Sequence, residues 1–371
     1  MIRRKLINFP DSSCDYRIGL GALDELSPMV TTIVGNPKRA VIVTSADLAD
    51  GPGIAVSRAL TDAGFRVSDL SFPAGEDVGT LAYAQQLFEA LDGTSVTSDD
   101  LIVALGDARV CGIVQFCSRS WCGGTACVLI PTTLDGMATV ATAMHPLSTQ
   151  GSEGMVWLPS RPSMVVVDLN LVREEREAGS DSLKLGYLEL MSSTMMDCRR
   201  AWEEFGGRLP GILAGEEIPL IDALCEAQAA RLSVVKAPNI GSRAATLYGV
   251  TTARALRACL GDGIPWYRLL AEGMAFEARL GTDVGKITVE DVFEQDDRMV
   301  AMGIDELPFS ISYDRFLSAL KETRFKRTNR FLFAIPHGLG SIRYAVVEEE
   351  LLERHARAYL ASRAELLDED A

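Results

Sequence analysis

The 371-residue sequence has few of the residues and segments that mark several common classes of protein. It contains only three histidines, which leaves little choice for a histidine-rich metal site or a histidine acid–base pair. No apolar run approaches the roughly 20 residues needed to cross a bilayer, so we expect no membrane partner. The basic start, Arg3-Arg4-Lys5, is not followed by an apolar core and does not predict a secretory signal; we therefore expect a cytoplasmic protein.

Positive charge is also scarce. The formal net charge is −15 and the sequence pI is about 4.8. A nucleic-acid-binding protein needs a basic surface to neutralise phosphates, so we expect no nucleic-acid partner. A small anionic substrate is not excluded, because a few local arginines and lysines are enough to bind it. The excess of acidic residues is typical of a charge balance that favours solubility.

The eight cysteines contain no Cys-x-x-Cys pair. Four of them cluster, at Cys111, Cys117, Cys122 and Cys127, but at spacings of six, five and five residues. A structural zinc site normally shows a tighter pair of cysteines. We therefore predict buried, reduced thiols that pack as small apolar side chains.

Short apolar runs alternate with helical patterns in the first half of the chain. Leu101–Leu105 is long enough for a buried strand and too short for a helix. Such alternation predicts a parallel, doubly wound α/β sheet. The remaining predicted strands are a short one at the start of residues 13–24, followed by a glycine turn and a helix start, and Ala40–Thr44, Phe65–Leu70, Ala126–Ile130 and Val165–Leu169. The predicted helices are Ala55–Ala63, Leu81–Leu91 and Val110–Cys117.

The pattern changes near Leu171, where we place a domain boundary. From Arg173 to about Leu280 the apolar spacing is mostly helical. A late strand is predicted near Arg330–Ile335 and a charged amphipathic helix at Val346–Leu360. The sequence thus predicts a Rossmann-like α/β domain, residues 1–171, and a mainly α-helical domain, residues 172–371.

Two turns follow neighbouring predicted strands. The turn Gly106–Arg109 follows the strand that starts at Leu101, and the loop Pro131–Gly136 follows Ala126–Ile130. Ligands of open α/β sheets bind beyond the carboxyl ends of such strands. We therefore expect the two segments to face one shared pocket.

These segments carry a resemblance to a known family. Ala104–Gly106 with its following helix, and then Ile130-Pro131-Thr132-Thr133-Leu134, resemble 3-dehydroquinate synthase and the wider sugar-phosphate cyclase family. The resemblance extends from about Tyr16 to Leu351. It implies the two-domain fold, an active-site crevice between the domains and a homodimer.

The same resemblance shows where this sequence departs from the family. The family turn has three glycines and an Asp shortly after them, whereas here it reads Gly106-Asp107-Ala108-Arg109 and the Asp position is Gly112. A family Lys that follows the Gly75-Glu76 pair is Gly79 here. Asp107 puts a carboxylate where the phosphates of a nicotinamide cofactor would lie, so we predict that NAD binding has been lost.

The resemblance also locates the family's zinc ligands, one Glu and two His. Their positions hold Ser182, Val250 and Trp266 in this sequence, and a further family His is Arg254. Valine and tryptophan have no lone pair to donate to zinc, and Asp181 beside Ser182 would not hold the ion alone. We predict that zinc binding has also been lost.

Candidate catalytic residues are His145, which stands at a family Lys position, with Asp135, Arg254 and Lys184. The residues expected to bind an anionic substrate are Arg243, Arg268, Lys326, Arg327, Trp266, Asp107 and Arg109. The alternative for each cationic residue is an ordinary solvated side chain, and for His145 a loop residue without a role.

Three functions remain open. The first is a repurposed enzyme of specialised, natural-product metabolism that catalyses cyclisation, condensation or elimination on a small anionic carbonyl compound without metal or NAD. The second is a non-catalytic relative that binds a metabolite or pairs with an active cyclase. The third is an NAD-dependent sugar-phosphate cyclase with altered sites.

Overall fold

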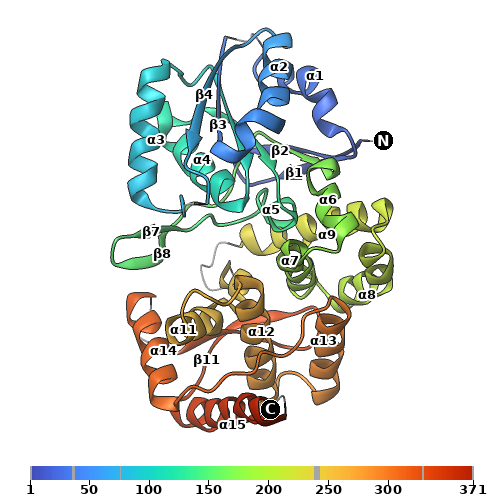
Figure 1. Ribbon diagram of the computed structural model, residues 1–371, viewed down its shortest axis with the longest axis vertical. Coiled ribbons are helices and arrows are strands. Elements are labelled where there is room, and N and C mark those ends of the chain that lie inside the picture. The colour runs from blue at the N-terminus through green and yellow to red at the C-terminus, as the bar shows by residue number, and fades with distance from the viewer. Residues whose placement is uncertain (1, 36–37, 76, 238–242, 328–329, 370–371) are drawn as a thin grey trace. The chain divides into compact units, whose positions relative to one another are not determined.

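The computed structural model describes residues 2–35, 38–75, 77–237, 243–327 and 330–369. The chain divides into two compact units (Figure 1). Unit 1 comprises Met1–Gly186 and Ala227–Lys236, and unit 2 comprises Tyr187–Glu226 and Ala237–Ala371.

Unit 1 is built on a seven-stranded sheet in which all neighbouring strands except β1 and β2 are parallel. The strands in spatial order are β1 (Arg3–Asn8), β2 (Ser13–Gly19), β9 (Met164–Asp168), β6 (Ala126–Pro131), β5 (Leu101–Gly106), β3 (Arg39–Ser45) and β4 (Arg66–Phe72). The predicted parallel strands are confirmed. The antiparallel edge strand β1 was not predicted, because most of its side chains are exposed and it lacks a continuous apolar run.

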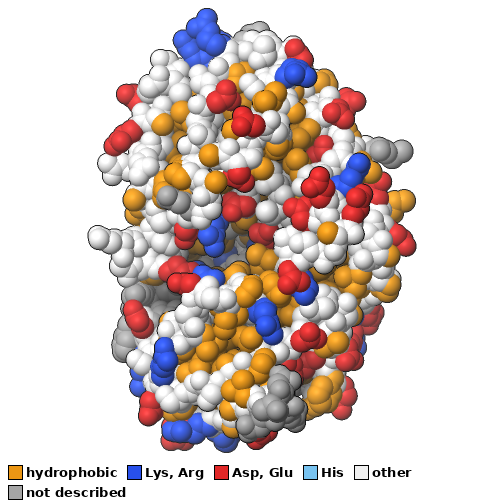
Figure 2. Space-filling model, viewed as in Figure 1, with side chains coloured by type: hydrophobic (Ala, Val, Ile, Leu, Met, Phe, Trp, Pro, Cys, Tyr) orange, Lys and Arg blue, Asp and Glu red, His pale blue; other side chains and the backbone are white. Residues whose placement is uncertain are grey.

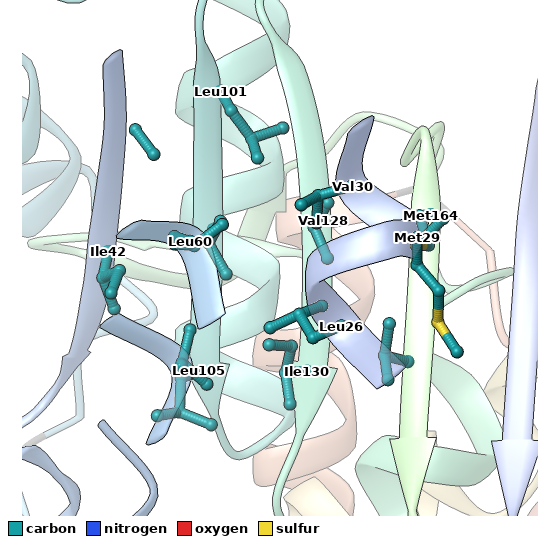
Figure 3. Packing of buried hydrophobic residues seen from close by; sticks show 14 of the residues in the cluster. Leu26, Met29, Val30, Ile42, Leu60, Leu101, Leu105, Val128, Ile130 and Met164 are labelled. Atoms are coloured by element: carbon teal, nitrogen blue, oxygen red, sulfur yellow. The ribbon is translucent and has the colours of Figure 1, made fainter. Parts of the chain in front are cut away.

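Helices cover both faces of this sheet (Figure 1). The core on one face is formed by α1 (Leu26–Thr31) and α2 (Ile54–Asp62), which pack on the strands as Figure 3 shows. The other face carries α3 (Leu81–Thr94) and α4 (Ala108–Ser120). Because the central strands are covered on both sides, every residue of β5 and β9 is buried. Their sequences are accordingly apolar up to the last residue of each strand.

The neighbouring strands β3 and β5 form the switch point of the sheet. The chain leaves β3 toward α2 on one face and leaves β5 toward α4 on the other. At this point the Thr44 hydroxyl donates a hydrogen bond to the Leu105 carbonyl (2.8 Å). In open α/β sheets such a switch point is where ligands bind, so the residues that follow β5 are the first place to look for a site.

Unit 1 extends beyond the predicted boundary near Leu171. Gly186, in α7 (Lys184–Thr194), lies so close to α5 (Leu134–Thr139) that a Cβ on it would be 2.4 Å from Leu134 Cγ. Gln228, in α9 (Glu217–Val235), donates its amide hydrogens to the carbonyls of Met137 and Ala138 (3.1 and 2.7 Å). These contacts join residues 172–186 and 227–236 to the sheet.

Unit 2 is mainly helical, as predicted. Its helices include α8 (Arg199–Leu213), α11 (Val250–Leu260), α12 (Trp266–Asp283), α13 (Val289–Ala301), α14 (Tyr313–Arg327) and α15 (Glu349–Glu369). The late strand is confirmed as β10 (Leu332–Pro336), which pairs with β11 (Ile342–Val346). The last helix begins three residues later than predicted because Val346 belongs to β11.

The remaining elements are α6 (Arg173–Ala178), the hairpin of β7 (Leu147–Thr149) and β8 (Ser152–Val156), several short 3-10 helices and one π-helical segment, Ala49–Gly53. None of the helices in the described ranges is both long and apolar enough to span a bilayer. Acidic side chains are spread over the surface in Figure 2, in keeping with the net charge of −15.

A buried ionic network ties α12 to α15 inside unit 2. Glu272 accepts hydrogen bonds from Arg363 Nε (2.8 Å), the Tyr359 hydroxyl (2.5 Å) and the backbone N–H of Leu307 (2.8 Å). Arg363 also pairs with Glu306 (2.7 Å). Since the buried carboxylate and guanidinium satisfy each other, removal of either one would leave an unpaired charge in the core.

Two glycines allow α11 and α12 to approach closely. Gly249, at φ 76°, immediately precedes α11, and Gly273 lies within α12. A Cβ on Gly273 would be 2.0 Å from the Gly249 carbonyl oxygen. No real Cβ tolerates such a distance, so this contact requires glycine.

We predict that Gly273→Ala lowers the stability of unit 2. Overpacking of this kind costs roughly 1–3 kcal/mol, and here the obstacle is backbone that cannot rotate away. The measurement is the melting temperature by calorimetry, with Gly207→Ala as the matched control. Gly207 is an exposed helical glycine with open space around its Cβ position, so that substitution should be neutral or slightly stabilising. An equal effect of the two substitutions would contradict the role given to the contact.

Candidate functional site

The turn between β5 and α4, at the switch point of the sheet, carries the acidic side chain of Asp107. Asp107 is the N-cap of α4, and its Oδ1 accepts hydrogen bonds from the backbone N–H groups of Arg109 (3.0 Å) and Val110 (2.9 Å). The N-terminus of a helix favours negative charge because its first N–H groups lack partners within the helix. Here a carboxylate of the chain itself supplies that charge.

The loop after β6 lies against this turn, as predicted. The backbone N–H of Thr132 donates to the Gly106 carbonyl (2.9 Å). Thr133 caps α5, and Gly136 sits over the start of α4, since a Cβ on Gly136 would be 3.4 Å from the Ala108 nitrogen. The two segments therefore form one continuous surface at the carboxyl end of β5 and β6.

Asp135 lies in this loop as a second carboxylate. It is half-buried, and burial raises its pKa above the usual value; repulsion by Asp107 raises it further, while the hydrogen bond to Thr133 acts in the opposite direction. A carboxyl group that keeps its proton to higher pH than usual can serve as a proton donor. We call Asp107 and Asp135 together the carboxyl pair.

Cationic side chains stand near the carboxyl pair, but each has an acidic partner. Arg109 is exposed and its Nη1 lies 3.5 Å from Asp77 Oδ1. Lys184 Nζ lies 2.7 Å from Asp181 Oδ1. Lys184 is two residues from Gly186, which contacts Leu134, so Lys184 belongs to the same end of the sheet as Asp135. Asp181 is well exposed, so the ion pair with Lys184 can open to water or to a ligand.

His145 lies inside unit 1, which corrects the expectation of an accessible acid–base group. Its side chain is only 6% exposed and its Nε2 lies 3.1 Å from the Val140 carbonyl. A carbonyl only accepts, so Nε2 carries the proton. Burial lowers the pKa of His145 to about 4, and nearby Arg231 contributes in the same direction. The imidazole is therefore neutral near pH 7 and packs against α4, where a Cβ on Gly112 would be 2.9 Å from its Nδ1.

The three family zinc-ligand positions carry side chains that do not fit zinc. Ser182 is exposed in a single 3-10 turn, and its backbone N–H donates to Ser180 Oγ (3.2 Å). Val250 is the first residue of α11, and Trp266, the first of α12, stacks against the Arg257 guanidinium at 4.5 Å. In the described ranges no group of three or more His, Cys, Asp or Glu side chains is placed to hold a metal ion.

The other predicted substrate-binding cations belong to unit 2. Arg243 Nε donates to the Ala237 carbonyl (2.9 Å), Arg268 approaches the Glu306 carbonyl (3.5 Å), and Arg254 is half-buried on α11, one turn after Val250. Lys326 and Arg327 end α14, and their side chains lie outside the described part of the structure.

Cysteine chemistry is not a feature of this surface. All eight cysteines are free, and six of them are buried. Cys111 follows the carboxyl pair's turn on α4, and burial raises its pKa well above the usual value. The thiol is thus held protonated and is a poor nucleophile.

The sequence did not point to Glu277, the most completely buried acid of unit 2. Its carboxyl group accepts hydrogen bonds from the Gly249 N–H (2.8 Å) and the Thr252 hydroxyl (3.0 Å) at the start of α11. Burial raises its pKa to about 8. The available signal was its position in α12, where it falls among apolar residues of the buried face.

A protein-family model described as 3-dehydroquinate synthase N-terminal matches residues 69–178, which include both turns of the carboxyl pair. Curated 3-dehydroquinate synthases are similar over nearly the whole chain. The enzyme of Synechococcus sp. (strain CC9605) is 26% identical over 351 residues, which cover 90% of this chain and 92% of that protein. The enzyme of Caulobacter vibrioides is 23% identical over 372 residues, covering 97% and 98%.

Solved structures share the fold. The 2-epi-5-epi-valiolone synthase of Streptomyces hygroscopicus subsp. jinggangensis 5008, solved with NAD⁺ and Zn²⁺ bound, superposes with a TM-score of 0.79 at 17% identity and covers 97% of this chain and 99% of that one. A 2-deoxy-scyllo-inosose synthase complexed with carbaglucose-6-phosphate, NAD⁺ and Co²⁺ gives 0.78 at 16% identity, with coverage of 96% and 100%.

The α/β unit and the helical unit thus have the fold of these two solved synthases. Together with the sequence matches, this makes the chain similar to 3-dehydroquinate synthases in sequence, at low identity, and to the solved cyclase structures in fold.

We predict that Glu277 makes stability fall as pH rises. Its pKa is about 8 in the folded chain and 4.5 for the ordinary group, so the folded state holds the proton more tightly. The resulting stabilisation is complete below pH 4.5 and is lost as pH rises to about 8, by up to roughly 1.4 kcal/mol for each unit of pKa difference.

The measurement is the melting temperature from pH 5 to 9. Glu277→Gln, which keeps the shape of the protonated acid, should flatten this profile. The exposed Glu290→Gln on α13 is the control and should leave it unchanged. A Glu277→Gln profile as steep as that of the parent would refute the prediction.

Proposed function

We propose that this chain is a repurposed 3-dehydroquinate synthase-like enzyme of specialised metabolism. In this proposal it catalyses cyclisation, condensation or elimination on a small anionic carbonyl compound, and it uses neither zinc nor a nicotinamide cofactor. The observation that carries the proposal is the carboxyl pair at the switch point, where one acid holds the helix amides and the other has a raised pKa.

The side chains at the family cofactor positions support independence from zinc and NAD. Ser182, Val250 and Trp266 include no imidazole, thiolate or carboxylate, which are the groups that bind zinc in proteins. At the family's pyrophosphate position, the Asp107 carboxylate would repel phosphate oxygens. Proton transfer and fixed charges are the chemistry that this set of residues can supply.

Asp135 is the proposed general acid. With its pKa raised by burial and by Asp107, it retains a proton that it can donate to a carbonyl or hydroxyl oxygen, and the carboxylate formed can then remove a proton from carbon or oxygen. Lys184 is the proposed group that binds the substrate's negative charge, because its partner Asp181 is exposed and replaceable. Arg254 on α11 remains a candidate for the same task. His145 has no part in the proposal, since its buried Nε2 is bonded to Val140.

A non-catalytic relative is the second candidate. It is favoured by the burial of His145 and by the closure of the α4 N-terminus by Asp107, which remove two groups that would contact a substrate. In that case the protein would bind a metabolite, or associate with an active cyclase, without turnover of its own. A homodimer is the assembly we propose for the enzymatic alternative.

The first test is cofactor dependence. The purified protein is screened against small phosphorylated and carboxylated carbonyl compounds, with and without EDTA, added zinc and NAD. We expect any turnover to be unchanged by all three additions, because no described side chain at the cofactor positions would bind them. Turnover that requires zinc or NAD would refute the proposal, and binding without turnover would favour the non-catalytic alternative.

The second test concerns the acid. Asp135→Asn should lower kcat by roughly 10²–10⁴, the usual contribution of a general acid, with a much smaller change in KM. Asp77→Asn removes an exposed carboxylate near the same surface and serves as the matched control. A pH profile that loses its high-pH limb in Asp135→Asn alone supports the role. Equal kcat in the two variants would exclude Asp135 as the acid.

A further inference from the structure

The start of α4 presents three backbone N–H groups that the helix itself cannot satisfy. The first bond within the helix runs from the Cys111 N–H to the Asp107 carbonyl (3.0 Å), which leaves the N–H groups of Ala108, Arg109 and Val110. Such groups at the end of a parallel strand are the usual place where a protein binds a phosphate. What happens to each of them decides whether this edge of the sheet can accept an anion.

Two of the three N–H groups are hydrogen-bonded by the turn itself. Asp107 Oδ1 accepts hydrogen bonds from Arg109 and from Val110. The third, on Ala108, lies beside Gly136 of α5, where an added Cβ would be 3.4 Å from the Ala108 nitrogen. An incoming phosphate would have to displace a carboxylate that is covalently part of the same turn.

The neighbouring charges act in the same direction. Asp135 is close enough to Asp107 for their repulsion to be one cause of the altered ionisation of Asp135. Nearby Arg109 is paired with Asp77, and Asp77 Oδ1 also accepts a hydrogen bond from the Gly79 N–H (3.1 Å). An anion at the N-terminus of α4 would therefore meet the carboxylates of Asp107 and Asp135 first.

We propose that the Asp107 carboxylate permanently occupies the position at the α4 N-terminus where an anion would otherwise bind. The chain therefore carries a closed phosphate site, and loss of this one side chain would open it. The inference concerns the chain's own amides and does not depend on the proposed reaction. The family's pyrophosphate group and the residues present here do not fit each other, and Asp107 is the physical reason.

The test uses the full chain and inorganic pyrophosphate as the probe, measured by isothermal titration calorimetry. The parent protein should show no saturable binding in the millimolar range. Asp107→Gly should bind pyrophosphate at least about tenfold more tightly than the parent, since glycine frees both amides and is itself tolerated at an N-cap. NAD is titrated in parallel and should remain unbound by the parent.

Asp107→Asn separates occupancy from charge. Its side-chain oxygen still caps the helix but is neutral, so this variant should stay closed. Binding by Asp107→Asn as tight as that by Asp107→Gly would overturn occupancy as the cause. Saturable binding of pyrophosphate or NAD by the parent would overturn the proposal as a whole, as would a normally helical Asp107→Gly protein that binds no better than the parent.

A second measurement needs no variant. The backbone ¹⁵N and ¹H shifts of Arg109 and Val110 in the parent should be unaffected by pyrophosphate, because their N–H groups are already bonded. Saturable shift changes at these two residues would show an open site and refute the proposal, even if Asp107→Gly failed to fold.

Discussion

Two hydrogen bonds from backbone amides to one carboxylate determine the charge at the carboxyl end of β5 in unit 1. Because Asp107 satisfies Arg109 and Val110, the helix gains its stabilising negative charge without any ligand. The same charge acts on Asp135 and favours its protonated form. The position where other α/β folds bind phosphate is here occupied by a carboxylate of the chain itself.

The two units have diverged by different routes. In unit 1 the turn Gly106–Arg109 departs from the family pattern at several positions, while the strand and helix around it are regular. In unit 2 the helices α11 and α12 begin with Val250 and Trp266, while buried polar groups deeper in the helix pair, Glu277 with Thr252 and Glu272 with Arg363, are fully engaged.

Much of the fold could be predicted because buried parallel strands are continuously apolar. The runs at β3, β5, β6 and β9 needed only their length and their flanking glycines or prolines to be recognised. The strand β1 was missed because an edge strand with exposed charged residues has no such signal. Glu277 lies among apolar residues in the sequence, but its hydrogen-bond partners, Gly249 and Thr252 at the start of α11, could be located only in the structure.

His145 shows why the surroundings of a candidate site residue could not be predicted from the sequence. A histidine in a loop before Pro146 looks accessible, but its burial depends on a residue more than thirty positions earlier. Gly112 has no side chain, and this leaves room for the imidazole against α4. In the comparison with the family, Gly112 stands where an Asp is expected and His145 where a Lys is expected. In the folded chain these two residues pack against each other. Such compensation is visible only when both partners are located in space.

The glycine contact between α11 and α12 has a consequence for how this lineage can change. The backbones of this helix pair are already in contact at Gly249 and Gly273, so neither helix can slide or tilt without a steric clash. New specificities in unit 2 must therefore arise by exchange of exposed side chains on a fixed frame, so that ancestral and derived forms should differ in chemistry far more than in backbone shape.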